Sequence, residues 1–119
     1  MSGYVIAQIN LKNKEGYKEY VEKVPKSIAS FGGKYLVRAG EYKHLEGKWD
    51  YSRNVVIKFP TYEKALEWYN SEEYELIKHL RLNNSEGNLI IIKLFKMLPM
   101  LQIRLLNLAS NGWLCNCTD

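Results

Sequence analysis

Three arginines stand out in a chain that otherwise supplies positive charge through lysine. Between residues 4 and 95, arginine occurs only at Arg38, Arg53 and Arg81. A planar guanidinium group holds a carboxylate or phosphate through two parallel hydrogen bonds, which an ammonium group cannot do. These positions therefore indicate a site for a small anion, with Arg53 and Arg81 as candidate catalytic residues and Arg38 as a candidate ligand-binding residue. The alternative is that each arginine braces a loop by pairing with a neighbouring acid such as Glu41 or Glu46.

Glu46 is also a candidate for chemistry in its own right. It lies in a predicted loop, next to Gly47. A carboxylate acts as a general base when burial raises its pKa, so Glu46 is a candidate catalytic residue. The alternative is a structural carboxylate that accepts hydrogen bonds from Arg53 or from backbone amides.

Three aromatic residues are candidates for binding a flat apolar ligand. Trp68, Tyr69 and Tyr74 each combine a ring with one polar atom, as side chains that line such pockets do. Packing in the core is the alternative, above all for Tyr69. Tyr74 and Arg81 stand seven residues apart in a predicted helix, so they lie on the same helical face about two turns apart. A phenol and a guanidinium group can therefore face one shared space.

The sequence lacks the motifs of several other chemistries. It holds no Ser-His-Asp order, no phosphate-binding glycine loop, no nucleotide-binding fingerprint and no cluster of metal ligands. Cys115 and Cys117 stand too close together for an easy disulfide and lack the further nearby ligands of a zinc site. We therefore predict no metal and no cofactor, which leaves a cofactor-free acid–base or oxidative mechanism, or no reaction.

Charge and hydropathy narrow the choice of partners. The net charge of the 119 residues is +4, and the lysines are scattered among glutamates without forming a basic stripe, which argues against nucleic-acid binding. The apolar stretches are too short to span a membrane, and the first ten residues lack the basic start of a secretory signal. We expect a cytoplasmic protein that binds neither nucleic acid nor membrane.

Periodicity predicts the element order β-α-β-β-α-β in one domain that spans residues 1–95. Strands are expected over residues 3–11, 34–42, 53–59 and 88–95, the second of them broken near Gly40. Helices are expected over residues 14–31, 62–70 and 71–82. Pro25 is expected to kink or divide the first helix, because it has no N–H and its ring collides with the preceding turn. A turn is expected over residues 83–87.

This order is that of a ferredoxin-like α+β sandwich, whose two crossovers place the helices on the same face of the sheet. The first and last strands carry apolar side chains on both faces. The uncovered face is therefore expected to associate with a second copy and give a homodimer. Residues 96–119 form an apolar tail, expected as a short helix followed by a loose end, or as a non-native extension.

Several phrases resemble one known family. They are Gly32-Gly-Lys-Tyr-Leu-Val-Arg38, Leu45-Glu-Gly-Lys-Trp49, Ala65-Leu-Glu-Trp-Tyr69 and Ser71-Glu-Glu-Tyr74. Together they resemble the family catalogued as domain of unknown function 1330, from Tyr4 to about Phe95. The resemblance implies a dimeric α/β barrel of ferredoxin-like halves, related to small monooxygenases, isomerases and stress-responsive proteins. The chain departs from the pattern at Ala39, where a second glycine is more common, and in its tail.

The expected function combines these points. We expect a small pocket in each subunit, lined by the arginines, Glu46 and the aromatic residues, that takes a small anionic or aromatic metabolite. The alternative is a ligand-binding or purely structural dimer without turnover. Arginines that converge on a cavity would favour the first, and closed salt bridges would favour the second.

Overall fold

The computed structural model describes residues 1–95, and the predicted tail helix lies outside the described residues. The observed elements are β1 Gly3–Leu11, α1 Lys14–Ser30, β2 Lys34–Arg38, β3 Arg53–Phe59, α2 Tyr62–Asn70, α3 Glu72–Asn84 and β4 Ser85–Lys93. This is the expected β-α-β-β-α-β order. The second helical region consists of two helices, α2 and α3, as the sequence also predicts.

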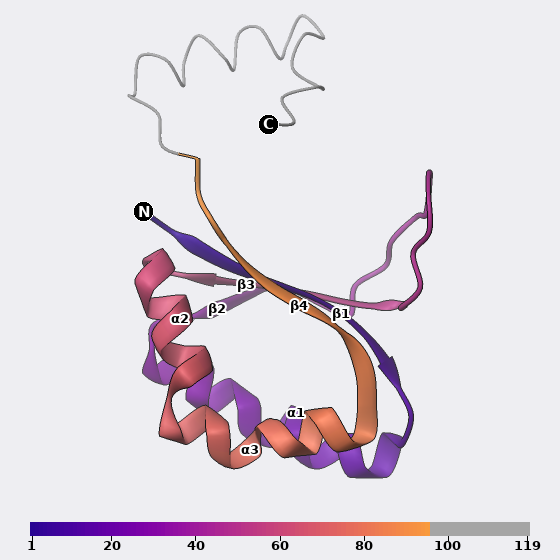
Figure 1. Cartoon of the computed structure of the whole chain (residues 1–119), viewed down its shortest axis with the longest axis horizontal. Helices are drawn as coiled ribbons and strands as arrows, with labels where there is room; N and C mark the ends of the chain where they lie inside the picture. The colour runs from indigo at the N-terminus through magenta and orange to yellow at the C-terminus, as the bar shows by residue number, and fades with distance from the viewer. Residues whose placement is uncertain (96–119) are drawn as a thin grey trace, which may run out of the picture.

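The four strands form one antiparallel sheet in the order β2-β3-β1-β4. In the centre of the sheet, Val5 of β1 lies opposite Ile57 of β3 on one side and Ile91 of β4 on the other. All three helices lie on the same side of the sheet (Figure 1), which leaves the opposite face open. The predicted ferredoxin-like α+β fold is confirmed.

Polar side chains fix where the helices begin. The side chain of Asn13 accepts a hydrogen bond from the Gly16 amide at 3.2 Å, and Thr61 accepts one from the Lys64 amide at 3.0 Å. Ser71 ends α2 and starts α3, because its hydroxyl accepts a hydrogen bond from the Tyr74 amide at 3.1 Å. These caps satisfy N–H groups that have no partner within their own helix.

Three expected boundaries are wrong. β2 ends at Arg38 and not at residue 42, because Ala39 adopts the left-handed region with φ 56° and the chain leaves the sheet. No turn separates α3 from β4, since the helix ends at Asn84 and the strand starts at Ser85. Gly87 lies inside the strand, where a side chain would collide with the backbone oxygen of Gln8. The last strand therefore starts three residues earlier than expected.

Pro25 does not divide the first helix. α1 runs unbroken from Lys14 to Ser30 with Pro25 inside it. A proline at this position cannot donate to the carbonyl group four residues earlier, which is that of Val21. That carbonyl group receives a side chain of the site described below.

The two faces of the sheet differ in exposure. Val5, Ala7 and Ile9 of β1 point toward the helices and are buried. The core on this side consists of these residues together with Tyr17, Tyr20, Val24, Ile28, Ile57, Phe59, Ala65, Trp68 and Tyr74. On the open face, Ile90 and Ile92 of β4 are 52% and 43% exposed.

Candidate functional site

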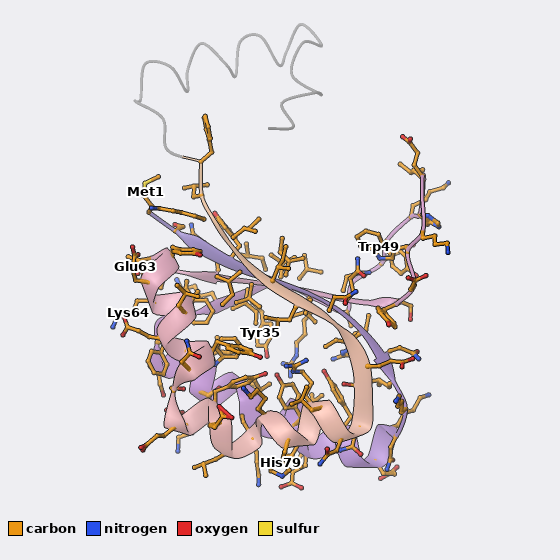
Figure 2. The ribbon with its side chains drawn as sticks, viewed as in Figure 1. Met1, Tyr35, Trp49, Glu63, Lys64 and His79 are labelled. Carbon is orange, nitrogen blue, oxygen red and sulfur yellow. The ribbon has the colours of Figure 1, made fainter. Side chains whose placement is uncertain are left out.

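A cavity of about 30 Å³ lies between the sheet and the helices. This is room for about two water molecules. Its polar lining consists of three tyrosines and three arginines, namely Tyr17, Tyr20, Tyr35, Arg38, Arg53 and Arg81, and no aspartate or glutamate lines it. Figure 2 shows Tyr35 in the space between the sheet and the helices. We call this space the arginine cavity.

Arg53 enters the cavity from the first position of β3. Its register partner on β1 is Ile9, which is buried, so Arg53 lies on the helix-covered face. The guanidinium group lies over the ring of Tyr17, 5.7 Å from its centroid. Its Nε atom is buried, and it is the only such side-chain atom of residues 1–95 without a hydrogen-bond partner. An unpaired buried donor costs free energy, so Arg53 offers a hydrogen bond that the protein itself leaves unused.

Arg38 is held at the edge of the cavity by the first helix. It lies opposite Val55 at the end of β2 and is exposed. Its Nη2 atom donates a hydrogen bond of 2.9 Å to the carbonyl oxygen of Val21. This is the carbonyl group that Pro25 leaves without its helical donor. The proline thus supplies the acceptor that positions an arginine of the site.

Arg81 reaches the cavity from α3 and begins a row of hydrogen bonds that runs through Tyr74 to Tyr20. It is 7% exposed, and its Nε atom donates a hydrogen bond of 3.1 Å to the hydroxyl of Tyr74. The hydroxyl groups of Tyr74 and Tyr20 lie 2.9 Å apart in a buried hydrogen bond. The predicted pairing of Tyr74 and Arg81 on one helical face is confirmed, but Tyr74 is completely buried and does not line the cavity.

Burial keeps the phenols of the cavity neutral. Burial raises the pKa of Tyr17, and the guanidinium groups of Arg53 and Arg81 offset part of that rise. Burial raises the pKa of Tyr20 far above its ordinary value, and the neighbouring Tyr74 phenol adds to the shift. The pKa of Tyr35 is also raised by burial. At neutral pH these side chains therefore keep their protons and can donate hydrogen bonds.

Trp68 and Tyr69, the other predicted ligand-binding aromatics, differ in position. Trp68 is 1% exposed and lines the cavity, and its Nε1 atom donates a hydrogen bond of 3.0 Å to the hydroxyl of Ser27. Tyr69 packs against the rings of Trp68 and Tyr74 outside the lining, with the Lys78 ammonium group 4.5 Å from its ring centroid. Its position is that of a packing residue.

Glu46 lies away from the arginines. It belongs to the connection between β2 and β3, residues 39–52, which we call the arm. The arm extends away from the helices, past the open face of the sheet (Figure 1). Glu46 is exposed there and borders a second hollow of about 240 Å³ together with His44, Trp49 and neighbouring residues. The structure therefore does not bring Glu46 to the arginine cavity, and its catalytic role stays a prediction.

The bracing alternative is not found for the arginines. Every ion pair within residues 1–95 uses a lysine, as in Lys23 with Glu19 and Lys12 with Glu86. Arg38, Arg53 and Arg81 form none with an acid in this part of the chain. Positive charge in the cavity is thus balanced only by neutral phenols and one backbone carbonyl group.

Two further searches cover the same described residues. No group of three or more histidine, cysteine, aspartate or glutamate side chains is placed to hold a metal ion in residues 1–95. None of the three helices is long and apolar enough to cross a membrane.

Sequence reasoning missed the tyrosines Tyr17, Tyr20 and Tyr35. Tyr17 and Tyr20 share the apolar face of α1 with Val24 and Ile28, so their spacing looks like that of ordinary core residues. One property of the sequence could have identified them. A tyrosine on a buried helix face needs a hydrogen-bond partner for its hydroxyl group, which indicates a polar site inside the core.

Solved structures with a similar backbone define the class of fold. The RPA0582 protein of unknown function from Rhodopseudomonas palustris matches with a TM-score of 0.64 at 16% identity, over 81% of this chain and 84% of that one. SnoaB, a cofactor-independent oxygenase from Streptomyces nogalater, matches with a TM-score of 0.55 at 8% identity, over 82% and 97%. The hypothetical Arabidopsis thaliana protein AT3G17210 matches with a TM-score of 0.55 at 11% identity, over 81% and 90%.

This chain therefore has a ferredoxin-like α+β fold. At these identities the likeness concerns the backbone alone. The sequence is more specific: it belongs to the family described as Domain of unknown function (DUF1330), which matches residues 2–95. The predicted family is thus confirmed. A search of curated proteins gives no match.

Proposed function

We propose that the chain binds a small anionic metabolite in the arginine cavity. The observation that carries the proposal is the convergence of arginines from β2, β3 and α3 on one cavity that no acid lines. A folded chain loses free energy when it desolvates cations without pairing them, and a bound anion recovers that loss. The buried, unused Nε donor of Arg53 supports this proposal, because a bound anion would give it an acceptor.

The same lining limits the chemistry that the site supports. Its polar groups are guanidinium cations and phenols whose pKa is raised, so none of them accepts a proton near neutral pH. This arrangement stabilises negative charge on a substrate oxygen but does not create that charge by proton abstraction. The ligand must therefore already be an anion when it binds. Two functions are compatible with this requirement: ligand binding without turnover, and cofactor-free oxidation. SnoaB is named a cofactor-independent oxygenase, which supports the second possibility by fold analogy only.

We also propose that a second copy of the chain covers the open face of the sheet. Ile90 and Ile92 are about half exposed there, and Ile6 and Val56 lie in register beside Ile90 across β1 and β3. Such an aliphatic surface on a protein of this size is typical of an association site. A two-fold dimer pairs this surface with itself.

The test of the binding proposal combines mass spectrometry and titration. Native mass spectrometry of the freshly purified full chain should show a retained small acid or binding from an added panel of small carboxylates. Arg53→Met keeps the length of the side chain but removes its charge and donors, so it should abolish the adduct. Lys18→Met on the exposed face of α1 is the matched control and should keep it. Absence of any bound acid in the unmodified chain would contradict the proposal.

A further inference from the structure

Two hydrogen bonds link Arg81, Tyr74 and Tyr20 in sequence. The Nε atom of Arg81 is a donor only, so the Tyr74 oxygen accepts from it. Tyr74 is completely buried, and within residues 1–95 the only further hydrogen-bond partner of its hydroxyl is the Tyr20 oxygen. Either direction of the Tyr74–Tyr20 bond leaves one phenol proton unpaired. Only Tyr20 lines the cavity, so we infer that Tyr74 donates to Tyr20 and that the unpaired proton is the one beside the cavity.

This direction leaves the proton of Tyr20 without a partner. The Tyr20 oxygen accepts from Tyr74, and no other hydrogen bond of its hydroxyl exists in the described part of the chain. Tyr20 lines the arginine cavity, as does Arg53, whose Nε donor is also unused. Two unused donors from different elements, α1 and β3, thus belong to the lining of one small cavity.

We infer that Tyr20 is a ligand-binding residue at the end of the donor chain Arg81→Tyr74→Tyr20, and that it and Arg53 together select a carboxylate. The inference rests on the proposed anion site and names the head group that this site recognises. A carboxylate has two acceptor oxygens and no donor, so it satisfies both protons. A neutral amide has a single acceptor oxygen and no charge, so it would leave the guanidinium charge of Arg53 unbalanced.

The size of the cavity agrees with such a head group. A volume of about 30 Å³ holds about two water molecules, which is close to the three heavy atoms of a carboxylate. Any larger part of the metabolite must leave the cavity. Arg38 is exposed at the edge, so the remainder of the molecule has a polar exit beside it.

The test uses formate and formamide, which share a three-atom skeleton and differ in charge. In the 15N-labelled full chain, the Nε–H signals of Arg53 and Arg81 are followed by NMR during each titration. Ionic strength is held constant with sodium chloride, so that general screening does not imitate binding. We expect formate to shift both signals along a saturable curve and formamide to leave them nearly unchanged.

Variants then test the role of Tyr20. Tyr20→Phe removes one hydrogen bond to a charged ligand, so formate affinity should fall roughly tenfold or more. Tyr74→Phe removes the group that polarises Tyr20 but keeps the Tyr20 hydroxyl, so the loss should be smaller, about threefold. Tyr62→Phe removes a hydroxyl on α2 outside the cavity and is the matched control, with affinity unchanged.

The outcomes separate this inference from the proposed function. If formate saturates the Arg53 signal in both the unmodified chain and Tyr20→Phe with equal affinity, the anion site stands and the donor chain is wrong. If formamide binds as well as formate, the selection of a carboxylate is wrong. If formate and acetate both fail to produce a saturable shift, the anion site itself is wrong. If Tyr20→Phe does not fold, Tyr74→Phe decides the question. Unchanged formate affinity in that variant would show that the donor chain Arg81→Tyr74→Tyr20 is wrong.

Discussion

Each face of the sheet departs in one respect from the usual distribution of side chains. Toward the helices, the buried strand residues Val5 and Ile9 lie in the same lining as the guanidinium groups of Arg53 and Arg81. On the opposite face, where solvent reaches the sheet, Ile90 and its neighbours are aliphatic and about half exposed. Each arrangement costs free energy in an isolated chain. The comparison supports both proposals, because a bound anion would offset the cost on one face and a second copy would offset it on the other.

Ile90→Ser tests the open face and carries the largest expected effect. About half of this side chain would be newly buried in the proposed dimer, so its loss should weaken self-association by about 0.8–1.5 kcal/mol per subunit, counted twice in a symmetric dimer. The stability of each subunit should change little, because Ile90 is already 52% exposed. Light scattering at micromolar concentration measures the first quantity and thermal melts measure the second.

Leu76→Ser supplies the control for that change. Leu76 is 75% exposed on α3, on the other side of the molecule, and should leave the molar mass unchanged. An unmodified chain that scatters as a monomer would remove the distinction between the two faces, since the aliphatic face would then be ordinary surface.

Much of the fold could be predicted because it depends on local patterns. Alternation fixed the strands β1 and β3, and the caps Asn13, Thr61 and Ser71 fixed the helix starts. The predicted turn at residues 83–87 was wrong for a non-local reason. Its Asn, Ser and Gly composition is typical of turns, whereas Gly87 is required by the close approach of β1.

The site could be predicted only in part, for the same reason. The rarity of arginine in a lysine-rich chain indicated three residues, and all three line one cavity. Glu46 was a candidate because it is a carboxylate in a loop that ends in glycine, but it borders the hollow of the arm and not the arginine cavity. The Tyr20 hydroxyl and the Val21 carbonyl depend on contacts 54 and 17 residues apart, which no local pattern encodes.

Pro25→Ala tests the helix-covered face with an intermediate effect. The new N–H group should donate to the Val21 carbonyl oxygen and displace Arg38 from it. Stability should rise by about 1–2 kcal/mol, less than the full cost of about 3 kcal/mol for a helical proline, because proline also restricts the unfolded chain. Thermal melts measure the gain, and the Nε–H signal of Arg38 should report a more mobile side chain.

Lys26→Ala is the matched control, since it changes the adjacent exposed residue without adding a backbone donor. It should alter neither the Arg38 signal nor the stability by more than a few tenths of a kcal/mol. A gain in stability for Pro25→Ala with an unchanged Arg38 signal would show that the freed carbonyl group does not hold the arginine in place.

Ala39→Gly tests the point where the chain leaves the sheet for the arm, and it carries the smallest expected effect. Ala39 has φ 56°, a conformation that costs an L-residue with a side chain about 1–2 kcal/mol and costs glycine almost nothing. Glycine also gives the unfolded chain more freedom, which removes about 0.4–1 kcal/mol of that gain. The net result should be a stabilisation of at most about 1.6 kcal/mol, measured by denaturant unfolding. Ala29→Gly near the end of α1 is the control with the opposite sign, because Ala29 already has helical geometry and glycine there costs up to about 1 kcal/mol. Equal destabilisation by both changes would mean that Ala39 is not strained, and the sharp exit of the arm from β2 would need another cause.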